Sequence, residues 1–250
     1  MNKAACKVIA ICNHKGGVAK TTTTINLGAA LSKLGERVLL IDADPQSNLS
    51  QSLGLEDETP SISDVFALKV NELPIKKLSE NLSLVPASLD LSAVEPSMYS
   101  NINSYFILKT QIDKIKSDYD YILIDCPPSL GILTQNALIA ANDVLIIVQA
   151  QFLALKGLDT IYSLVQSVRD KLNEKISVLG MLLTQTNHTR ISKGLAQSLR
   201  VTFKEKVFDT TIRQNVAIAE ASANRNDIFS YAPESFGAID YMNLAKEILQ

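Results

Sequence analysis

Near the start of the chain, lysines, glycines and threonines are spaced as in a loop that binds phosphate. The stretch reads NHKGGVAKTTTT over residues 13–24. Glycines let a backbone approach a phosphate, lysines neutralise its charge, and a threonine hydroxyl can ligate Mg²⁺. The residues expected to bind a nucleotide are Lys15, Gly16, Gly17, Val18, Ala19, Lys20, Thr21 and Thr22. The stretch joins an apolar, strand-like run to a helical pattern, which is the context that a phosphate loop requires.

This stretch departs from the common phosphate-loop pattern G-x-x-x-x-G-K-[ST] at both glycines. Counting back from Lys20, the two glycine positions hold His14 and Ala19, and Lys15 is an additional lysine. A left-handed backbone at Ala19 would cost about 1–2 kcal/mol. Because Ala19 directly precedes the predicted helix, we expect a right-handed backbone there and no strain.

Two further motifs place carboxylates after apolar runs. LLIDADPQSN contains Asp42 and Asp44, whose side chains point to opposite sides of an extended strand, so one of them can face the phosphate loop. The alternative for either residue is a strand-end cap. YILIDCPPSLG places Asp125 at a strand end, a position suited to an acid that holds Mg²⁺ through water. The two prolines and Gly131 that follow predict a stiff turn with a hinge, suited to sensing a γ-phosphate.

The elements that must position these residues alternate between strand and helix patterns. The predicted strands cover residues 7–12, 37–42, 82–87, 121–126, 143–149 and 176–184, with a weaker run at 206–212. Several are apolar at consecutive positions, as strands buried on both faces must be. The first helical pattern ends at Gly35, and residues 54–81 are predicted to form a loop-rich surface insertion. We therefore predict one α/β domain over residues 1–250, a doubly wound, mostly parallel sheet with helices on both faces.

Composition limits the classes of protein to consider. The 250 residues are 46% hydrophobic with a net charge of −2, which allows a large core and excludes a polycation. Cys6, Cys12 and Cys126 lie in or beside apolar runs, so we predict three buried thiols in a reducing cytosol. The longest apolar tract, residues 137–155, is interrupted by polar residues and does not predict a membrane span.

At its three motifs the chain closely resembles the ParA/Soj/MinD family of deviant Walker A ATPases, in particular the small, Soj-like partition proteins. The resemblance runs along nearly the whole chain, through KGGVAKTT, DADPQ, DCPPSLG and YAPESFGAIDYMNLAKEIL. The family pattern is K-G-G-x-x-K-[ST], and its first lysine is the signature residue. The resemblance implies a P-loop NTPase fold, ATP and Mg²⁺ as cofactors, and ATP hydrolysis that is weak without a partner. It also places Asn187 where the family contacts adenine.

The resemblance implies a role for each remaining residue of the site. Lys15 would act in trans, reaching the partner's nucleotide when two subunits sandwich two ATP molecules, and Lys20 would act in cis. Thr21 and Asp125 would serve Mg²⁺. Asp44 would position the attacking water. Phosphoryl transfer depends mostly on such positioning and charge neutralisation.

Basic residues gather in the segment 185–225. This segment has seven lysines and arginines against three acidic residues, a net charge of +4, so the rest of the chain carries −6. The resemblance makes these residues candidate contacts for non-specific DNA, with Arg190 the best match and Lys193 close by. Arg213 is a weaker candidate, because the family often has arginine at the position of Ala217. The alternative is that these charges lie on ordinary solvated helix faces.

The ends of the chain bear on which branch of the family it resembles. The final IDYMNLAKEILQ predicts a helix that faces the core, unlike the basic amphipathic membrane anchor of the MinD branch. Only six residues precede the first strand, so we expect no N-terminal helix-turn-helix domain. Cys126 has no partner cysteine at a cluster-type spacing, so we expect no iron–sulfur role.

Together with these features, the resemblance implies a cytoplasmic, nucleoid-associated ATPase. It would form a homodimer with ATP, bind DNA without sequence preference, and be released when a ParB-like or other cargo adaptor stimulates hydrolysis. Such a cycle would position a plasmid, a chromosome region or another cargo. Two alternatives stay open. One is a MinD-like ATPase that cycles on a membrane, and the other is a switch that binds ATP but does not hydrolyse it, because of Ala19.

Overall fold

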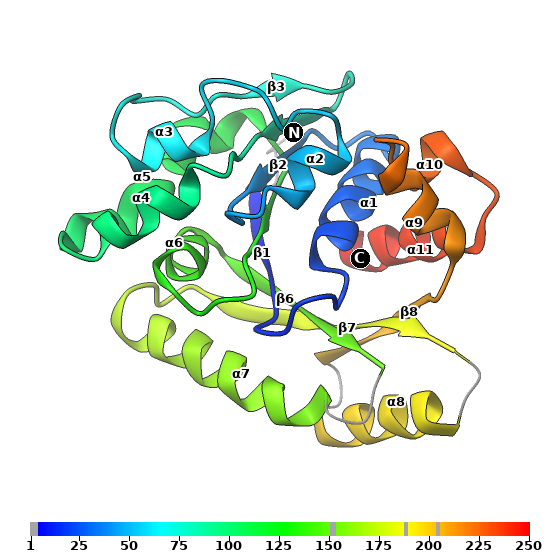
Figure 1. Cartoon of the computed structure of the whole chain (residues 1–250). Coiled ribbons are helices and arrows are strands. Elements are labelled where there is room, and N and C mark those ends of the chain that lie inside the picture. Colours follow the sequence, from blue (N-terminus) through cyan, green and yellow to red (C-terminus); the bar gives the residue numbers. More distant parts are fainter. Residues whose placement is uncertain (1–4, 151–153, 188–189, 204–205) are drawn as a thin grey trace.

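An eight-stranded sheet runs through the computed structural model of the chain, which describes residues 5–150, 154–187, 190–203 and 206–250 (Figure 1). The strands are β1 Lys7–Cys12, β2 Val38–Asp42, β3 Lys76–Lys77, β4 Leu82–Val85, β5 Tyr121–Asp125, β6 Asp143–Gln149, β7 Ser177–Thr186 and β8 Val207–Arg213. Their order is β3-β4-β2-β5-β1-β6-β7-β8, and every neighbouring pair is parallel except β3 and β4. The predicted doubly wound, mostly parallel sheet is confirmed. All seven predicted strands form, and the two-residue β3 was not predicted.

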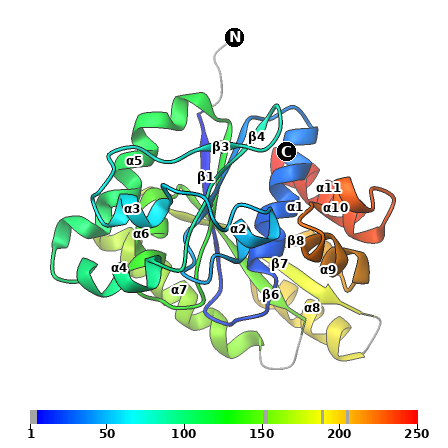
Figure 2. The ribbon, with the colours of Figure 1, turned by 45° about the horizontal axis from the view of Figure 1, so that its top comes forward.

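Helices cover both faces of this sheet (Figures 1 and 2). They are α1 Lys20–Lys33, α2 Asn48–Ser52, α3 Ile62–Phe66, α4 Leu91–Met98, α5 Ile107–Ile115, α6 Ile132–Ala140, α7 Ala154–Lys171, α8 Arg190–Phe203, α9 Val216–Ala223, α10 Ile228–Tyr231 and α11 Phe236–Leu249. Helices α3 to α8 contribute to the hydrophobic core on one face, and α1, α2 and α9 to α11 contribute to the core on the other.

The central strand β1 shows why the strand sequences are continuously apolar. Val8, Ala10 and Cys12 belong to the core on one face, while Ile9 and Ile11 belong to the core on the other. Successive side chains of a strand point to opposite faces, so a strand covered on both sides needs an apolar residue at every position. The same reason accounts for the other central strands.

The strand register brings the three motifs to one edge of the sheet. Asp125, at the end of β5, is paired with Ile11 of β1 on one side and with Asp42 of β2 on the other. The loop after β1 and the motifs after β2 and β5 therefore begin side by side. Ligands bind at this carboxyl edge in open α/β sheets.

The C-terminal helix α11 is a core helix, as predicted. Tyr241 is fully buried, and its hydroxyl lies 3.3 Å from the Thr23 hydroxyl of α1. The Lys7 ammonium donates to the carbonyl of Ile248 at 3.3 Å, which holds the end of α11 to the start of β1. No helix in the part of the chain that the structure describes is long and apolar enough to cross a membrane.

The segment 54–81 differs from the predicted surface insertion. It contains α3 and the edge strand β3, and Ile62, Val65 and Phe66 of α3 are buried in the core. These apolar residues follow helical spacing, and Ser61 with Asp64 forms a capping box at the start of the helix. A five-residue helix within a polar stretch gives too short a pattern to recognise from the sequence.

Two of the three cysteines are buried, as predicted, and Cys6 is only partly buried. The Cys12 sulfur lies 3.1 Å from the Cys126 sulfur. The two cysteines are neighbours because each directly follows one residue of the pair Ile11 and Asp125 at the ends of β1 and β5. The sequence did not predict this contact, because the two cysteines are far apart in the chain.

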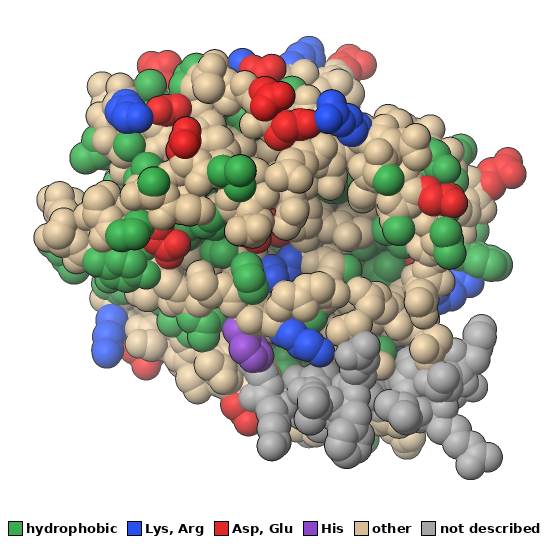
Figure 3. Space-filling model, in the orientation of Figure 1, with side chains coloured by type: hydrophobic (Ala, Val, Ile, Leu, Met, Phe, Trp, Pro, Cys, Tyr) green, Lys and Arg blue, Asp and Glu red, His purple; other side chains and the backbone are tan. Residues whose placement is uncertain are grey.

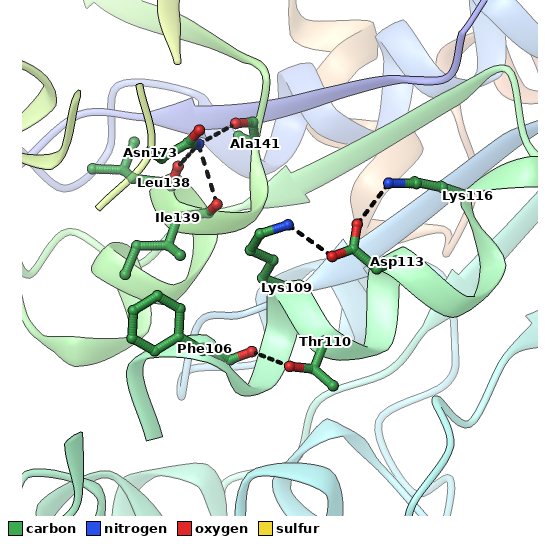
Figure 4. A network of polar contacts seen from close by, with 9 residues as sticks. All are labelled: Phe106, Lys109, Thr110, Asp113, Lys116, Leu138, Ile139, Ala141 and Asn173. Carbon is green, nitrogen blue, oxygen red and sulfur yellow. Dashed lines mark hydrogen bonds and ion pairs between the residues drawn. The ribbon is translucent and has the colours of Figure 1, made fainter. Parts of the chain in front are cut away.

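A distant asparagine binds backbone carbonyls at the C-terminal end of helix α6 (Figure 4). The Asn173 side-chain amide donates to the carbonyls of Leu138, Ile139 and Ala141 at 3.1, 3.1 and 2.7 Å. These bonds satisfy carbonyls that a helix end leaves unpaired.

Figure 4 also shows two lysines paired with Asp113 on and after α5, and such exposed pairs contribute little stability. A pocket of about 490 Å³ lies here, at the amino edge of the sheet and away from the three motifs.

Candidate nucleotide site

The loop between β1 and α1 is held in place by hydrogen bonds to β6 and β7. The Asn13 side chain donates to a backbone carbonyl of β6. From β7, the Thr184 hydroxyl donates to the carbonyl of Val18, and the Gln185 amide donates to the carbonyl of Gly17, both at 2.9 Å. The sheet therefore fixes both ends and the middle of the loop before any ligand binds.

The backbone of Ala19 contradicts the expectation from the sequence. Ala19 has φ 76° and ψ 33°, which is left-handed, although it directly precedes α1. Gly17 also has a positive φ of 73°. The common phosphate-loop pattern has glycine at the position of Ala19, and here an alanine adopts the conformation that glycine would favour. The left-handed conformation has a physical reason. The Thr184 hydroxyl anchors the neighbouring Val18 carbonyl, which restricts the backbone path from Val18 to α1.

We expect Ala19→Gly to stabilise the protein. A left-handed alanine costs about 1–2 kcal/mol that glycine does not. For a chain of this size, about 1 kcal/mol corresponds to a rise in melting temperature of about 2–4 °C, measurable by differential scanning calorimetry. Gly17→Ala is the matched control, because Gly17 is also left-handed and its added Cβ would meet no atom within 4 Å. Gly17→Ala should lower the melting temperature by a similar amount. An unchanged melting temperature for Ala19→Gly would show that Ala19 is unstrained.

The two lysines of the loop lie in different surroundings. Lys20 is only 7% exposed, and its ammonium donates to the carbonyl of Lys15 at 3.3 Å, so it lies inside the curve of the loop. Lys15 is exposed, and its ammonium lies 3.4 Å from the Gln149 side-chain oxygen. Gln149 in turn donates to Gln185 at 2.6 Å. One lysine is therefore placed for a phosphate within the loop, and the other lies at the surface beside it.

Thr21 and Asp125 meet at the start of α1. The Thr21 hydroxyl donates to Asp125 Oδ2 at 2.6 Å, and the Thr24 hydroxyl lies 3.4 Å from Oδ1. Asp125 is fully buried. Burial raises its pKa well above the usual value, and the nearby Asp42 carboxyl raises it further, whereas Thr21 and Lys20 lower it. A buried carboxyl in this situation favours binding of a cation, which would restore its charged form.

The donor atoms present fit Mg²⁺ that is shared with phosphate. Among the described residues there is no group of three or more His, Cys, Asp or Glu that could hold a metal ion by themselves. Thr21 and Asp125 offer a hydroxyl and a carboxylate, and Mg²⁺ is usually held by one or two such groups together with substrate phosphates and waters.

The structure distinguishes between the two acids of the second motif. Asp42 is fully buried and accepts hydrogen bonds from the Ser50 hydroxyl at 2.7 Å and the Ser50 backbone at 2.9 Å. The Ser50 hydroxyl accepts from Ala87 at 2.8 Å, so Asp42 ties α2 to the chain after β4. Burial raises the pKa of Asp42 to about 6. Asp44 makes fewer such bonds, accepting from the Gln46 backbone at 2.9 Å. Asp42 therefore has the structural role, and Asp44 is the candidate for chemistry.

A pocket of about 350 Å³ adjoins the loop at the start of α1. Ala19 and Thr22 line one side of it. Gln185, at the end of β7, and Gln214 and Asn215, between β8 and α9, line another. Apolar walls with a few amide groups are the usual lining of a small-molecule pocket. Its size and position next to the phosphate loop suit the base and sugar of a nucleotide.

Sequence reasoning missed several residues of this region. Gln149, Gln185 and Gln214 were not singled out, although the first two lie at the carboxyl ends of parallel strands, where ligands bind in this fold. That position is the signal that could have found them. Asn187 follows β7 and is exposed, and it is not among the residues that line the pocket.

The candidate DNA contacts fall into two groups. Arg190 and Lys193 lie in the first turn of α8, and their side chains are outside the described part of the structure. Arg213 is bound by Asp240, with its Nη2 2.7 Å from Oδ1, and its guanidinium lies 4.1 Å from the centre of the Phe236 ring. These contacts join β8 to α11, so Arg213 has a structural role that the sequence did not reveal.

Part of the positive charge of the segment 185–225 is compensated by acids from elsewhere in the chain. Arg213 pairs with Asp240, and Arg225 pairs with Glu56. Neither acid belongs to the segment itself. The charge available on this face therefore depends more on α8 than the count of +4 suggested.

The chain is similar to known proteins along nearly its whole length. A family model described as an AAA domain matches residues 6–178. The sporulation initiation inhibitor protein Soj of Bacillus subtilis is 41% identical over 97% of this chain and 98% of its own length. The chain belongs to the ParA/Soj/MinD family of deviant Walker A ATPases. The chromosome partitioning protein ParA of Caulobacter vibrioides, another similar protein, is 38% identical over 100% of this chain and 96% of its own length.

Solved structures extend this similarity to three dimensions. A cobyrinic acid a,c-diamide synthase from Mycobacterium smegmatis, with bound ATP analogue and magnesium, superposes with a TM-score of 0.85. It is 33% identical and covers 98% of this chain and 94% of its own. The resemblance to the ParA/Soj/MinD family predicted from the motifs is thus confirmed.

Proposed function

We propose that this ParA/Soj/MinD-family chain is an ATPase that dimerises around two ATP molecules, binds DNA without sequence preference and is released by hydrolysis. The observation that carries the proposal is the contrast between its two loop lysines. Lys20 is buried within the loop and Lys15 is exposed beside it. A site that worked alone would need only the buried one.

Within one subunit, each residue has a defined task. The loop backbone and Lys20 bind the β- and γ-phosphates of ATP, which the helix N-terminus also favours. Thr21 and Asp125 hold Mg²⁺, which when bound neutralises phosphate charge. Asp44 orients the water that attacks the γ-phosphate. The pocket lined by Gln185 and Asn215 takes the base and sugar.

Between subunits, Lys15 supplies the remaining positive charge. Its ammonium leaves the long 3.4 Å contact with Gln149 and reaches the nucleotide of the partner subunit. Two triphosphates that face one another repel strongly, so a dimer forms only when such charges offset the repulsion. Hydrolysis removes the γ-phosphate that Lys15 contacts in the partner subunit. Turnover is therefore coupled to dissociation of the dimer.

The dimer would bind DNA through the start of α8. Arg190 and Lys193 from each subunit would contact phosphates, and doubling them in the dimer strengthens a weak, salt-dependent contact. A ParB-like or other cargo adaptor would stimulate hydrolysis and so release the protein from the nucleoid. The proposed location is therefore the cytoplasm, and the proposed role is positioning of a plasmid, a chromosome region or another cargo.

Asp44→Ala tests this cycle. We expect the variant to bind ATP with nearly wild-type affinity and to hydrolyse it at least about a hundredfold more slowly, because a misplaced nucleophile loses at least that much. It should accumulate as a dimer that stays on DNA. Gel filtration with ATP, with and without a DNA duplex, measures dimer formation and DNA binding. A variant that is only monomeric with ATP would refute the role of Asp44.

Asp42→Ala provides the contrast for this experiment. Asp42 is the neighbouring buried acid, which accepts three hydrogen bonds, one of them from the Asp44 backbone N–H. Its loss should mainly lower the melting temperature, while the Asp44 carboxylate is retained for hydrolysis. If the two variants behaved alike, the division of roles between the two acids would be wrong.

A further inference from the structure

The N-terminal end of helix α6 is capped by the side chain of a residue that follows helix α4. Gly131 stands at the N-cap position and makes no side-chain cap. Instead, the Ile132 backbone N–H donates to the Tyr99 hydroxyl at 3.1 Å. Tyr99 directly follows α4, so the end of α4 is tied to the turn 127–131 that follows Asp125.

Glu95 of α4 completes this contact. The Glu95 carboxylate and the Tyr99 hydroxyl both lie against Gly131, so the contact extends from α6 through Tyr99 to Glu95. Burial raises the pKa of Glu95, and the Asp44 carboxyl raises it further, while the bond from Tyr99 lowers it. Glu95 therefore lies at the contact between α4 and the turn 127–131.

The packing at Gly131 shows how closely α4 approaches the turn. A Cβ atom added at Gly131 would lie 2.7 Å from Glu95 Oε1 and 2.7 Å from the Tyr99 hydroxyl oxygen. Real Cβ atoms do not approach other atoms so closely, so any side chain at 131 would push Glu95 and Tyr99 away. The absence of a side chain at this position is therefore what permits the contact.

We propose that Glu95 and Tyr99 are positioning residues for ATP hydrolysis, which hold the turn 127–131 in its working arrangement. The inference rests on the proposed ATPase function. Neither residue needs to touch ATP. They act because the turn follows Asp125 directly, and a displacement of about 1 Å near reacting groups can cost a hundredfold in rate.

The hydroxyl of Tyr99 can be removed without opening the core. Tyr99 is 52% exposed, and it lies with Leu89 and Ile102 among the exposed hydrophobic residues around α4. Figure 3 shows hydrophobic side chains on the surface in this part of the molecule. Tyr99→Phe therefore keeps the ring and should leave the melting temperature within about 2 °C, since surface changes usually alter stability by less than about 0.5 kcal/mol.

The first test compares steady-state ATP hydrolysis of wild type and Tyr99→Phe in a phosphate-release assay with DNA present. We expect kcat to fall about tenfold and KM to stay within about twofold, as for an interaction needed only in the transition state. Tyr105→Phe is the matched control, because the Tyr105 hydroxyl makes no hydrogen bond with the described residues and Tyr105 lies in the short 3-10 helix Ile102–Phe106 that follows α4. It should retain the wild-type kcat. Equal kcat values for wild type and Tyr99→Phe would overturn the inference.

Variants of Glu95 and Gly131 separate positioning from a general loss of structure. Glu95→Gln keeps an acceptor for the Tyr99 hydroxyl and should retain more activity than Glu95→Ala. Gly131→Ala should lower kcat by displacing both partners, and adding it to Tyr99→Phe should cost much less than it does in wild type. Fully additive losses would mean that the residues act separately, and would overturn the inference. Wild-type protein that does not hydrolyse ATP would instead refute the proposed function itself.

Discussion

Replacing Lys20 with alanine is expected to abolish ATP binding. Lys20 is the buried lysine of the loop, with its ammonium held against the loop backbone. A charged hydrogen bond is worth about 1.5–3 kcal/mol, so losing contacts to two phosphates should weaken binding at least about a hundredfold. Isothermal titration calorimetry with ATP and Mg²⁺ measures the change directly.

Lys33→Ala is the control for this result, because Lys33 is an exposed lysine at the other end of the same helix. It should bind ATP as wild type does. A melting temperature close to that of wild type would show that Lys20→Ala is folded. If the folded Lys20→Ala variant kept micromolar affinity, the phosphate site would lie elsewhere.

Replacing Lys15 with alanine is expected to separate ATP binding from assembly. The variant should still bind ATP as a monomer, because Lys20 is retained. It should lose the dimer, since four phosphate-facing lysines become two while two triphosphates still meet across the interface. Analytical ultracentrifugation with ATP measures the monomer–dimer equilibrium. Lys77→Ala removes an exposed lysine from β3, four strands away from β1, and should dimerise normally.

Affinity for DNA should follow the loss of the dimer. The logarithm of the binding constant falls with the logarithm of salt concentration at a slope near −0.9 for each phosphate contacted. A dimer that makes about four to six contacts would give a slope of roughly −4 to −5, and the Lys15→Ala monomer about half of that. Equal slopes and equal affinities for the two proteins would mean that Lys15 is an ordinary surface charge.

Local patterns allowed the sequence to predict the sheet. Strands buried on both faces need runs of apolar residues, and helices need apolar residues at a spacing of three and four, so both can be recognised within a few residues. The places of the phosphate loop, Asp44 and Asp125 could also be predicted, because each lies at or just after the carboxyl end of such a strand. The short α3 and β3 lie in a polar stretch and were missed for the same reason, since their patterns are too short.

The role of each site residue depended on contacts between distant parts of the chain. The sequence determined that two lysines and two acids would lie near the loop, because the carboxyl ends of parallel strands lie at one edge of the sheet. Only the tertiary structure decided that Lys20 is buried and Lys15 exposed, and that the Asp42 carboxylate accepts a hydrogen bond from Ser50. The handedness of Ala19 was decided in the same way. Backbone angles at a single residue follow from where its neighbours are anchored, and β7 is remote in sequence.

The same distinction applies to the contacts around the site. The sequence by itself determined the fold class, the phosphate loop and the membership of the family, since these rest on local order and motif spacing. The pairing of Arg213 with Asp240 and the contact of Tyr99 and Glu95 with Gly131 were decided only by packing. Such contacts join residues 27 to 36 positions apart, and nothing in the local pattern specifies which of many possible partners a side chain will meet.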